Sequence, residues 1–190
     1  VEVSGGSEKT NFLVGLGYLT NEGTVINTDY KRLSFNLTGN VKVLDNLAVS
    51  GKALYSNSKT NASPWGDNVT FYRNAGMPPT TKIYFEDGTL APGANTSMGN
   101  PLYTMYLYDN DNKAENITLS LDADWQILPG LSFKPQVSLF RINKNAYSFL
   151  PSYWNGPLNY VSSRNASASN SGWTQYQADA ILDYVKTFWN

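Results

Sequence analysis

The chain contains no cysteine and no histidine, and these two absences exclude much of the chemistry that proteins carry out. Without cysteine there are no disulfides, thiolate metal sites or cysteine nucleophiles. Without histidine, the usual general base and the commonest metal ligand are missing. A Ser-His-Asp hydrolase and a zinc enzyme are therefore excluded, and we expect no enzymatic activity, no cofactor and no metal site.

Charged residues are also scarce. They make up 15% of the chain, against about 25% in ordinary globular proteins. The 14 basic and 15 acidic side chains give a formal net charge of −1. Binding to nucleic acid requires clustered Lys and Arg in clear excess over acidic residues. No nucleic-acid partner is expected.

Long apolar runs are missing as well. The longest, Phe12–Leu19, is interrupted by Gly15 and Gly17. A membrane-spanning helix needs about 20 mainly apolar residues, so helical spanning is excluded. A membrane β-barrel remains possible, because its strands place lipid-facing side chains only at alternate positions and are therefore mildly polar on average.

The chain does have a period-two alternation of apolar and polar residues. From Arg32 to Val43 the odd positions are apolar apart from Gly39, and the even positions are all polar. Residues 116–127 repeat this pattern, and weaker versions occur at 11–18, 47–58, 131–141 and 174–184. A helical period of 3.6 residues fits neither of the two clearest segments. We therefore predict an all-β fold of long antiparallel strands.

The connections between these strands alternate in length. Short links at residues 5–10, 44–46 and 128–130 alternate with longer ones at 20–29, 59–113 and 151–172. Outer-membrane barrels have this parity, with short periplasmic turns and long extracellular loops, and their strands need about 9–11 residues to cross the bilayer. The pattern favours a transmembrane β-barrel segment. A soluble, secreted β-sandwich that acts as a carbohydrate-binding or adhesin module is the alternative.

Several short motifs follow one another along nearly the whole chain. They are Ser4-Gly5-Gly6-Ser7-Glu8-Lys9-Thr10, Gly17-Tyr18-Leu19, Glu22-Gly23, Asp29-Tyr30-Lys31-Arg32, Met77-Pro78-Pro79, Asp87-Gly88, Asn100-Pro101-Leu102, Pro129-Gly130-Leu131-Ser132 and Tyr184-Val185-Lys186-Thr187-Phe188. In this order and at this spacing they resemble the early barrel region of the SusC/RagA family of TonB-dependent outer-membrane transporters.

This resemblance implies an active importer in the outer membrane of a Gram-negative cell. Such transporters are large barrels of the 22-stranded plugged class. They take up oligosaccharides or peptides, are powered through TonB, and work with a SusD-like surface lipoprotein that acts as a lid. Residues 1–190 would then be a partial TonB-dependent receptor barrel of about seven meander strands. The plug, the TonB box and the carboxy-terminal strands are absent, and the chain has no signal peptide, so we expect an excised piece of a longer protein.

Within such a barrel the apolar side of each strand faces lipid and the polar side faces the lumen. The predicted lipid-facing residues are Leu33, Phe35, Leu37, Val41, Leu119, Leu121, Trp125, Leu182 and Tyr184. The predicted lumen-facing residues are Asn36, Lys42, Lys52, Asp122, Asp124, Asp179 and Asp183. Trp125, Phe133, Tyr176 and Tyr184 are expected to lie at the membrane interfaces, although the core of a sandwich would hold aromatic residues too. Pro135 is expected to mark a bulge.

Two acidic motifs have spacings that resemble those of known sites. Asp122 and Asp124 share one face about 7 Å apart, a spacing not far from that of an inverting glycosidase pair. We interpret them as solvated or plug-contacting carboxylates of the wall. The segment Asp109-Asn110-Asp111-Asn112 resembles the start of a calcium loop but lacks the later Gly and Glu, so we expect a solvated turn.

The two longest loops are the candidate binding elements. Because a structureless loop of the length of 59–113 is unusual, we expect it to be packed, with a short helix at residues 67–75 ended by Gly76 and a turn at Glu86-Asp87-Gly88. Its aromatic residues would hold the loop together, stack on sugar rings or meet the lid lipoprotein, and contact with that partner ranks above contact with the ligand. The candidates in the two loops are Trp65, Tyr72, Tyr84, Tyr103, Tyr106, Tyr153 and Trp154.

Overall fold

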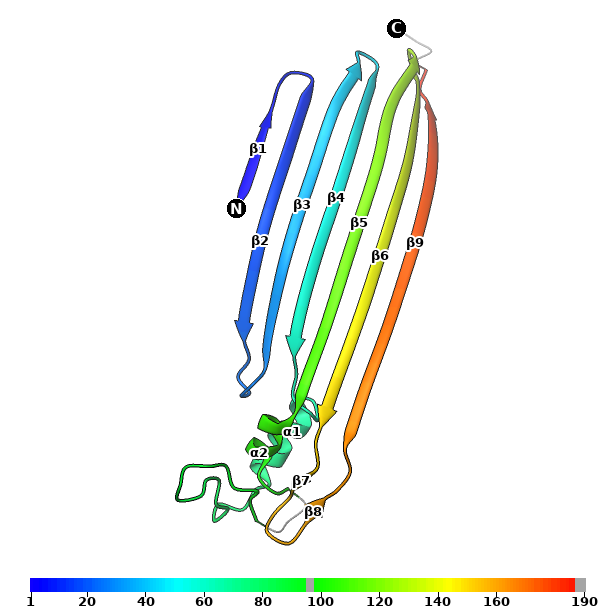
Figure 1. Cartoon of the computed structure of the whole chain (residues 1–190). Coiled ribbons are helices and arrows are strands. Elements are labelled where there is room, and N and C mark those ends of the chain that lie inside the picture. Colours follow the sequence, from blue (N-terminus) through cyan, green and yellow to red (C-terminus); the bar gives the residue numbers. More distant parts are fainter. Residues whose placement is uncertain (95–97, 187–190) are drawn as a thin grey trace.

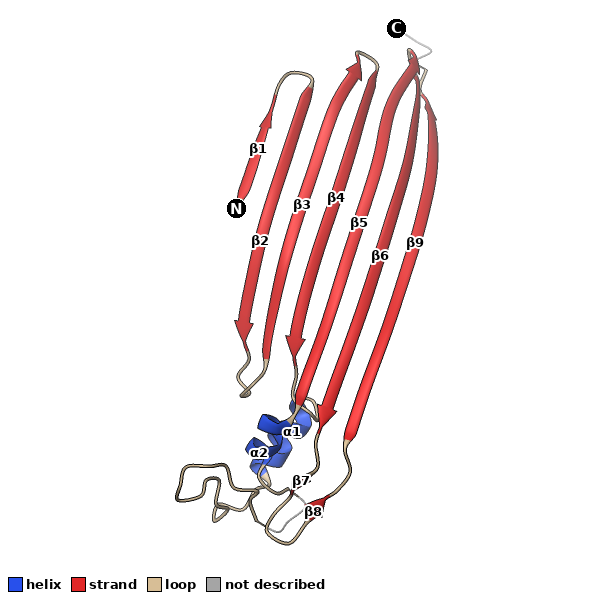
Figure 2. Cartoon of the chain, viewed as in Figure 1, coloured by secondary structure: helices blue, strands red, loops and turns tan. Residues whose placement is uncertain are grey.

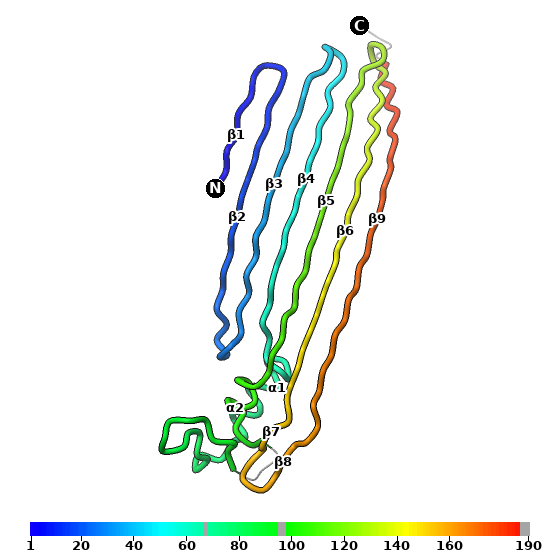
Figure 3. Tube along the Cα trace, viewed as in Figure 1, coloured from blue at the N-terminus to red at the C-terminus, as the bar shows by residue number. Residues whose placement is uncertain are grey.

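The computed structural model describes residues 1–94 and 98–186, which form one long up-and-down sheet with folded loops at one end (Figure 1). Seven strands run antiparallel in the order β1-β2-β3-β4-β5-β6-β9, as the path of the chain in Figure 3 shows. They are β1 (Glu2–Gly6), β2 (Thr10–Glu22), β3 (Asp29–Leu44), β4 (Leu47–Asn61), β5 (Asp109–Leu128), β6 (Leu131–Leu150) and β9 (Asn165–Tyr184). The predicted all-β meander is therefore confirmed. Thr187 and Phe188 of the last motif lie outside the described residues.

The long connections fold at the same end of the sheet (Figure 2). The first contains α1 (Asp67–Ala75) and α2 (Pro101–Leu107), and the second contains the short strands β7 (Tyr153–Trp154) and β8 (Tyr160–Val161). Helix α1 has the predicted bounds and ends at the predicted Gly76. Among the described residues no helix has the length and apolar character needed to cross a membrane.

The large sheet is a single layer. Within the described residues, the only other sheet is the two-stranded β7–β8 hairpin, so no second sheet covers either face. The buried apolar side chains of the described residues, Ala91, Pro101 and Met105, belong to the long loop rather than to the sheet. A sandwich needs two sheets packed over a shared core, so the β-sandwich alternative is wrong.

The strand limits match the prediction at the short-turn end and extend beyond it at the long-loop end. Strand β9 begins at Asn165, where residue 174 was predicted, and the two long loops therefore cover 62–108 and 151–164 instead of 59–113 and 151–172. In the extended parts, such as residues 165–172, small and polar side chains occupy both faces. Alternation disappears there, although the ladder continues as far as the Leu150–Asn165 pair.

Pro135 does not mark a bulge. Asp122 pairs with Gln136 and Trp125 pairs with Phe133, so the β5–β6 register is the same on both sides of the proline. The register shifts instead between Gln126 and Leu128, next to the turn. A proline removes one donor from the ladder without requiring an extra residue, which explains why the prediction of a bulge was wrong.

Candidate functional site

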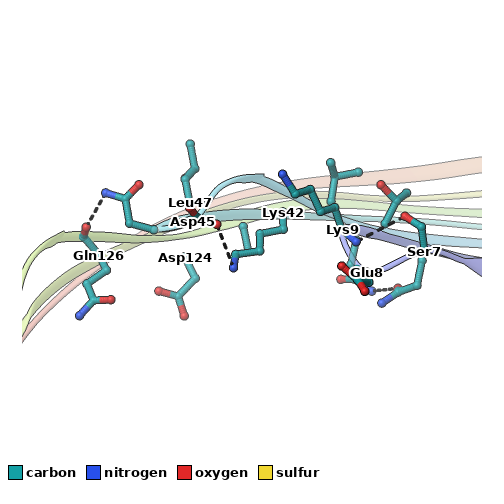
Figure 4. Close-up of a pocket in the computed structure, with 14 residues that line it drawn as sticks. Ser7, Glu8, Lys9, Lys42, Asp45, Leu47, Asp124 and Gln126 are labelled. Atoms are coloured by element: carbon teal, nitrogen blue, oxygen red, sulfur yellow. Dashed lines mark hydrogen bonds and ion pairs between the residues drawn. The ribbon is translucent and has the colours of Figure 1, made fainter.

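The register of the sheet places the two predicted sets of residues on opposite faces. Leu37 pairs with Ala53, Ala53 with Leu119, and Leu119 with Leu139. Directly paired residues point to the same side of a sheet. We call this side the apolar face, and it carries all the predicted lipid-facing residues. The predicted lumen-facing residues lie on the other side, the polar face. In Figure 4 Leu47 and Asp124 point to opposite sides of the sheet accordingly.

The apolar residues form a band that is slanted relative to the strands. In β3 the band extends to Leu33, but the residues in register with Leu33 on β5 and β6 are Glu115 and Asn143. In β5 it ends at Ile117, and in β9 it ends at Tyr176. Its limit therefore moves toward the short turns by four residues between β3 and β9.

The size of this shift gives the tilt of the band. Four residues span about 13 Å along a strand, and the four strand spacings from β3 to β9 span about 19 Å. The ratio corresponds to a tilt of about 35° between the strands and the normal to the band. Strands of membrane barrels are tilted by about 35–45°. The side chains of the band are well exposed, at 53% for Leu121 and 79% for Tyr176, and an extended exposed apolar surface marks contact with a membrane or a partner.

The polar face carries hydrogen-bonding and charged groups. Lys134 Nζ lies 3.0 Å from Asp183 Oδ2, and Gln177 donates a 2.7 Å hydrogen bond to Asp179. No three acidic side chains of the described residues lie close enough together to hold a metal ion. Asp122 and Asp124 pair with Ser50 and Ala48 on β4, so they lie within the sheet on its polar face.

The segment Asp109-Asn110-Asp111-Asn112 is not the predicted solvated turn. It forms the first four residues of β5 and is paired with β6 throughout. Asp111 contacts two lysines, with its carboxylate oxygens 3.2 Å from Lys59 Nζ and 2.6 Å from Lys113 Nζ. The pair with Lys59 joins β5 to β4, and together with the backbone ladder to β6 it holds the segment in the sheet, which explains why the prediction from turn-forming residue types was wrong.

A hollow of about 360 Å³ lies beside the short turns (Figure 4). Charges of both signs line it, among them Lys42 and Asp124 from the predicted lumen-facing set. Lys42 Nζ lies 3.4 Å from Asp45 Oδ1, and Asn46 donates a 2.9 Å hydrogen bond to the carbonyl of Gln126. The side chain of Asn46 therefore ties the β3–β4 turn to β5, and the lining of the hollow combines these polar groups with apolar side chains such as Val41 and Leu47.

The long loop is packed, as predicted, and Asn100 is at its centre. The side chain of Asn100 is 2% exposed and donates to the carbonyls of Ala91 and Ile83, at 2.6 and 3.1 Å. Its oxygen accepts a 3.1 Å hydrogen bond from the backbone N–H of Leu102 and thereby caps α2. In the sequence Asn100 stands out only as part of the motif Asn100-Pro101-Leu102, and this role was not predicted.

The predicted turn at Glu86-Asp87-Gly88 is confirmed by the antiparallel bridge between Tyr84 and Leu90. The hydroxyl and the backbone N–H of Thr89 donate to the Asp87 carboxylate, at 2.7 and 2.9 Å. These two hydrogen bonds lower the pKa of Asp87, because they stabilise the ionised carboxylate.

The candidate aromatic residues of the loops divide into two groups. Trp65 lies under the guanidinium of Arg73, 4.3 Å from ring centre to Cζ, and is half-buried, as are Tyr103 and Tyr153. These three contribute to packing. Four others are exposed: Tyr72, Tyr84, Tyr106 and Trp154. Of these, Trp154 packs against Tyr160, with ring centres 4.9 Å apart.

The structure also contains an apolar patch on the polar face that the sequence reasoning missed. Phe140 and Trp173 meet edge to face with their ring centres 5.5 Å apart. Ile142 pairs with Trp173, and Leu54 lies on the same face. The sequence does contain a signal for this patch. Residues 140 and 142 are apolar although they alternate with the apolar residue 139 and therefore lie on the polar face.

No protein-family model and no curated protein matches the sequence. Solved structures do match. The structure of the RagAB peptide transporter has a chain with a TM-score of 0.71 and 19% identity, and the match covers 94% of this chain and 21% of that chain. The RagAB peptide importer matches in its closed-closed and open-open states, each with a TM-score of 0.69, 18% identity and the same coverage. The chain thus has the fold of about a fifth of a RagAB transporter chain, and the resemblance to SusC/RagA transporters is confirmed at the level of the fold.

Proposed function

We propose that this chain forms part of the wall and the external loops of an outer-membrane barrel that imports oligosaccharides or peptides. The observation that carries the proposal is the slanted apolar band on one face, with a polar surface behind it. Such a band is suited to contact with lipid. All backbone groups of a barrel strand are hydrogen-bonded to neighbouring strands, so that only its side chains contact the lipid. The tilt of about 35° is that of a barrel wall.

The polar face would line the passage. Ser, Thr, Asn and Gln side chains keep such a surface wetted, and a hydrophilic solute can exchange hydrogen bonds with them as it moves. The wall performs no covalent chemistry in this proposal. Energy would come through TonB, and gating through a plug, from outside this segment.

The external loops would meet a lid of the SusD-like lipoprotein type. Their folded cores and their exposed Tyr72, Tyr106 and Trp154 support this role, since Tyr and Trp are enriched in protein interfaces. The solved structures that share the fold are of a peptide importer. Peptides are therefore the substrate class to test first.

The membrane placement can be tested by spin labelling in the complete protein that carries this segment. The chain has no cysteine of its own, so single cysteines can be introduced at residues 117–124 and labelled. In lipid bilayers we expect collisions with oxygen to be high at 117, 119, 121 and 123 and low at 118, 120, 122 and 124. Collisions with a water-soluble nickel complex should show the opposite alternation.

A label at Glu115 serves as the matched control, because it lies on the apolar face just beyond the band. It should be accessible to the nickel complex. Equal access of nickel to both faces throughout 117–124 would show that water surrounds the sheet, and the proposal would then fail.

A further inference from the structure

The part of the polar face nearest the long loops carries positive charge only. We call it the loop-side polar face, and it comprises the residues of β3, β4, β5, β6 and β9 on that face from the row of Leu54 to the long loops. Its charged side chains are Arg32 on β3 and Lys144 on β6. The strand pairing places both in one row, with Ser58 and Ala114 between them.

No acidic side chain of the chain balances these two charges at close range. Among the described residues, Arg32 and Lys144 form no ion pair. On the same face, Asp122 on β5 and Asp179 on β9 each lie eight residues from the row, which is about 26 Å along a strand. Glu2, on the edge strand β1, lies about 16 Å from Arg32 by strand spacing and register. The two positive charges are therefore a surplus that an anionic ligand can neutralise.

A hollow of about 370 Å³ lies next to the first of these cations. It is lined by Arg32, by the amides of Asn36 and Asn116 and by the apolar side chain of Leu54. Arg32 and Asn36 are exposed, and within the described residues the side chain of Asn36 forms no hydrogen bond. A guanidinium has five donors in a planar fork that matches a carboxylate. Arg32 can therefore hold a carboxylate while an amide group binds a neighbouring peptide group.

The apolar patch of Phe140 and Trp173 lies next to the second cation. Ile142 belongs to this patch and is two residues from Lys144 on β6, and it pairs with Trp173 on β9. Trp173 is 55% exposed although it is surrounded by polar side chains. An exposed aromatic ring on a polar surface offers a large apolar contact area to a ligand. An apolar side chain of a solute can pack there.

The dimensions of this surface fit a short extended peptide. Arg32 and Lys144 are three strand spacings apart, or about 14 Å, and the patch extends about 7–13 Å from their row toward the short turns. An extended chain advances about 3.3–3.6 Å per residue, so four or five residues cover the surface. A neutral oligosaccharide would leave both cations without a counter-charge, whereas a peptide can supply carboxylates and an apolar side chain together.

We propose that Arg32, Lys144 and the Phe140–Trp173 patch form a binding site for acidic peptides that carry an apolar side chain. The inference rests on the proposed function, because it needs the polar face to line a passage. The carboxylates of the peptide would lie at the row of Arg32 and Lys144, and its apolar side chain would pack on Trp173. The site would hold the solute on the part of the passage nearest the external loops.

The test measures peptide binding to the complete protein, purified in detergent, by isothermal titration calorimetry. The probes are acetyl-Phe-Ala-Ala-Glu, which carries two carboxylates, and the amide of acetyl-Phe-Ala-Ala-Gln, which has the same size and no charge. We expect the acidic peptide to bind about tenfold more tightly, because charge-assisted hydrogen bonds are stronger than neutral ones. Acetyl-Ala-Ala-Ala-Glu, which lacks the aromatic side chain, should also bind about tenfold more weakly.

Matched variants separate the two faces of the sheet. Arg32→Gln with Lys144→Gln should abolish the preference for the acidic peptide. Lys31→Gln with Arg141→Gln removes the same charge from the same two strands on the apolar face and should leave the preference unchanged. Trp173→Ala should remove the advantage of the aromatic probe, and Tyr176→Ala, on the other face of β9, should not.

A charge reversal distinguishes binding from a structural role. The variant Arg32→Glu with Lys144→Glu should bind the amide of acetyl-Phe-Ala-Ala-Lys more tightly than acetyl-Phe-Ala-Ala-Glu. Cations that served only the stability of the sheet would not produce this reversed preference. Its absence in a variant that still inserts into bilayers would overturn the inference.

Two further results would also overturn it. One is equal binding of the acidic and the neutral peptide by the unchanged protein. The other is binding that depends on Trp173 but not on Arg32, Lys144 or the carboxylates, which would indicate a neutral ligand such as an oligosaccharide. Both leave the proposed function standing if the spin labels at residues 117–124 still show lipid on the apolar face. Loss of that alternation would contradict the proposed function itself.

Discussion

At the residue scale, buried polar groups are concentrated in the long loop. Ser63, Thr70, Asn100 and Thr104 are the buried polar side chains of the described residues, and all lie between β4 and β5. Asn100 closes the loop onto itself through two carbonyls and one N–H. Gly93 permits this approach, because a Cβ there would lie 2.6 Å from the backbone nitrogen of Asn100. Hydrogen bonds between polar groups stabilise this loop where apolar burial is small.

Replacing Asn100 with Ala should loosen the loop without unfolding the sheet. The change leaves the Ala91 and Ile83 carbonyls without this donor and removes the cap of α2, which together cost about 1–3 kcal/mol. Hydrogen exchange of residues 83–94 and 100–107 should become faster, while exchange in β5 and β6 stays the same. Asn159→Ala, at an exposed loop position, is the control. Unchanged exchange in the loop would contradict the central role of Asn100.

At the element scale, the short turns fix the register of the hairpins. Gly130 in the β5–β6 turn has a φ of 85°, a conformation that favours glycine. Its carbonyl also accepts a 2.7 Å hydrogen bond from the N–H of Val185, which ties the end of β9 to the turn. One glycine therefore positions three strands at this end of the sheet.

Replacing Gly130 with Ala should lower the stability of the complete barrel by about 2 kcal/mol or more, from backbone strain and steric overlap together. The added Cβ would lie 2.2 Å from the carbonyl oxygen of Val185. Gly88→Ala is the matched control, since Gly88 has a similar φ of 83° but nothing lies within 4 Å of an added Cβ. It should cost about 1 kcal/mol or less. Urea unfolding measures both, and equal losses would exclude the overlap with Val185.

At the scale of the whole molecule, the two ends of the wall differ. Tight turns occupy one end and folded loops occupy the other (Figure 1). A small charged hollow lies beside the turns, and the loops carry exposed aromatic residues. Both faces between the ends are exposed in this chain. The wall therefore depends on its surroundings, with lipid proposed on one side and the passage on the other.

If the loops meet a lid lipoprotein as proposed, Tyr106→Ala combined with Trp154→Ala should weaken its binding to the complete protein by about tenfold or more, as expected for exposed aromatic anchors. Binding can be measured with the purified lipoprotein in detergent. Tyr176→Ala, in the apolar band, is the control and should leave binding unchanged. If peptide uptake fell while lipoprotein binding stayed normal, the loops would contact the substrate rather than the lid.

The sequence predicted the strands well only where one face is apolar. The ends at Leu47, Leu131 and Tyr184 match the structure, because the alternation continues to the short turns there. Beyond the band both faces are polar, and the start of β9 was misplaced by nine residues, from 165 to 174. The ladder continues without that pattern, since backbone pairing does not depend on which side chains alternate.

The all-β class, the meander order and the face on which each predicted residue lies could be predicted from the sequence, because a period of two fixes the side of every side chain once a strand is recognised. The slant of the band, the ion pair between Lys59 and Asp111, the Phe140–Trp173 pair and the hydrogen bonds of Asn100 became visible in the three-dimensional structure. Each of these depends on the register between strands or on contacts across the long loop. Residues far apart in the chain meet there, and a local pattern carries no record of how they align.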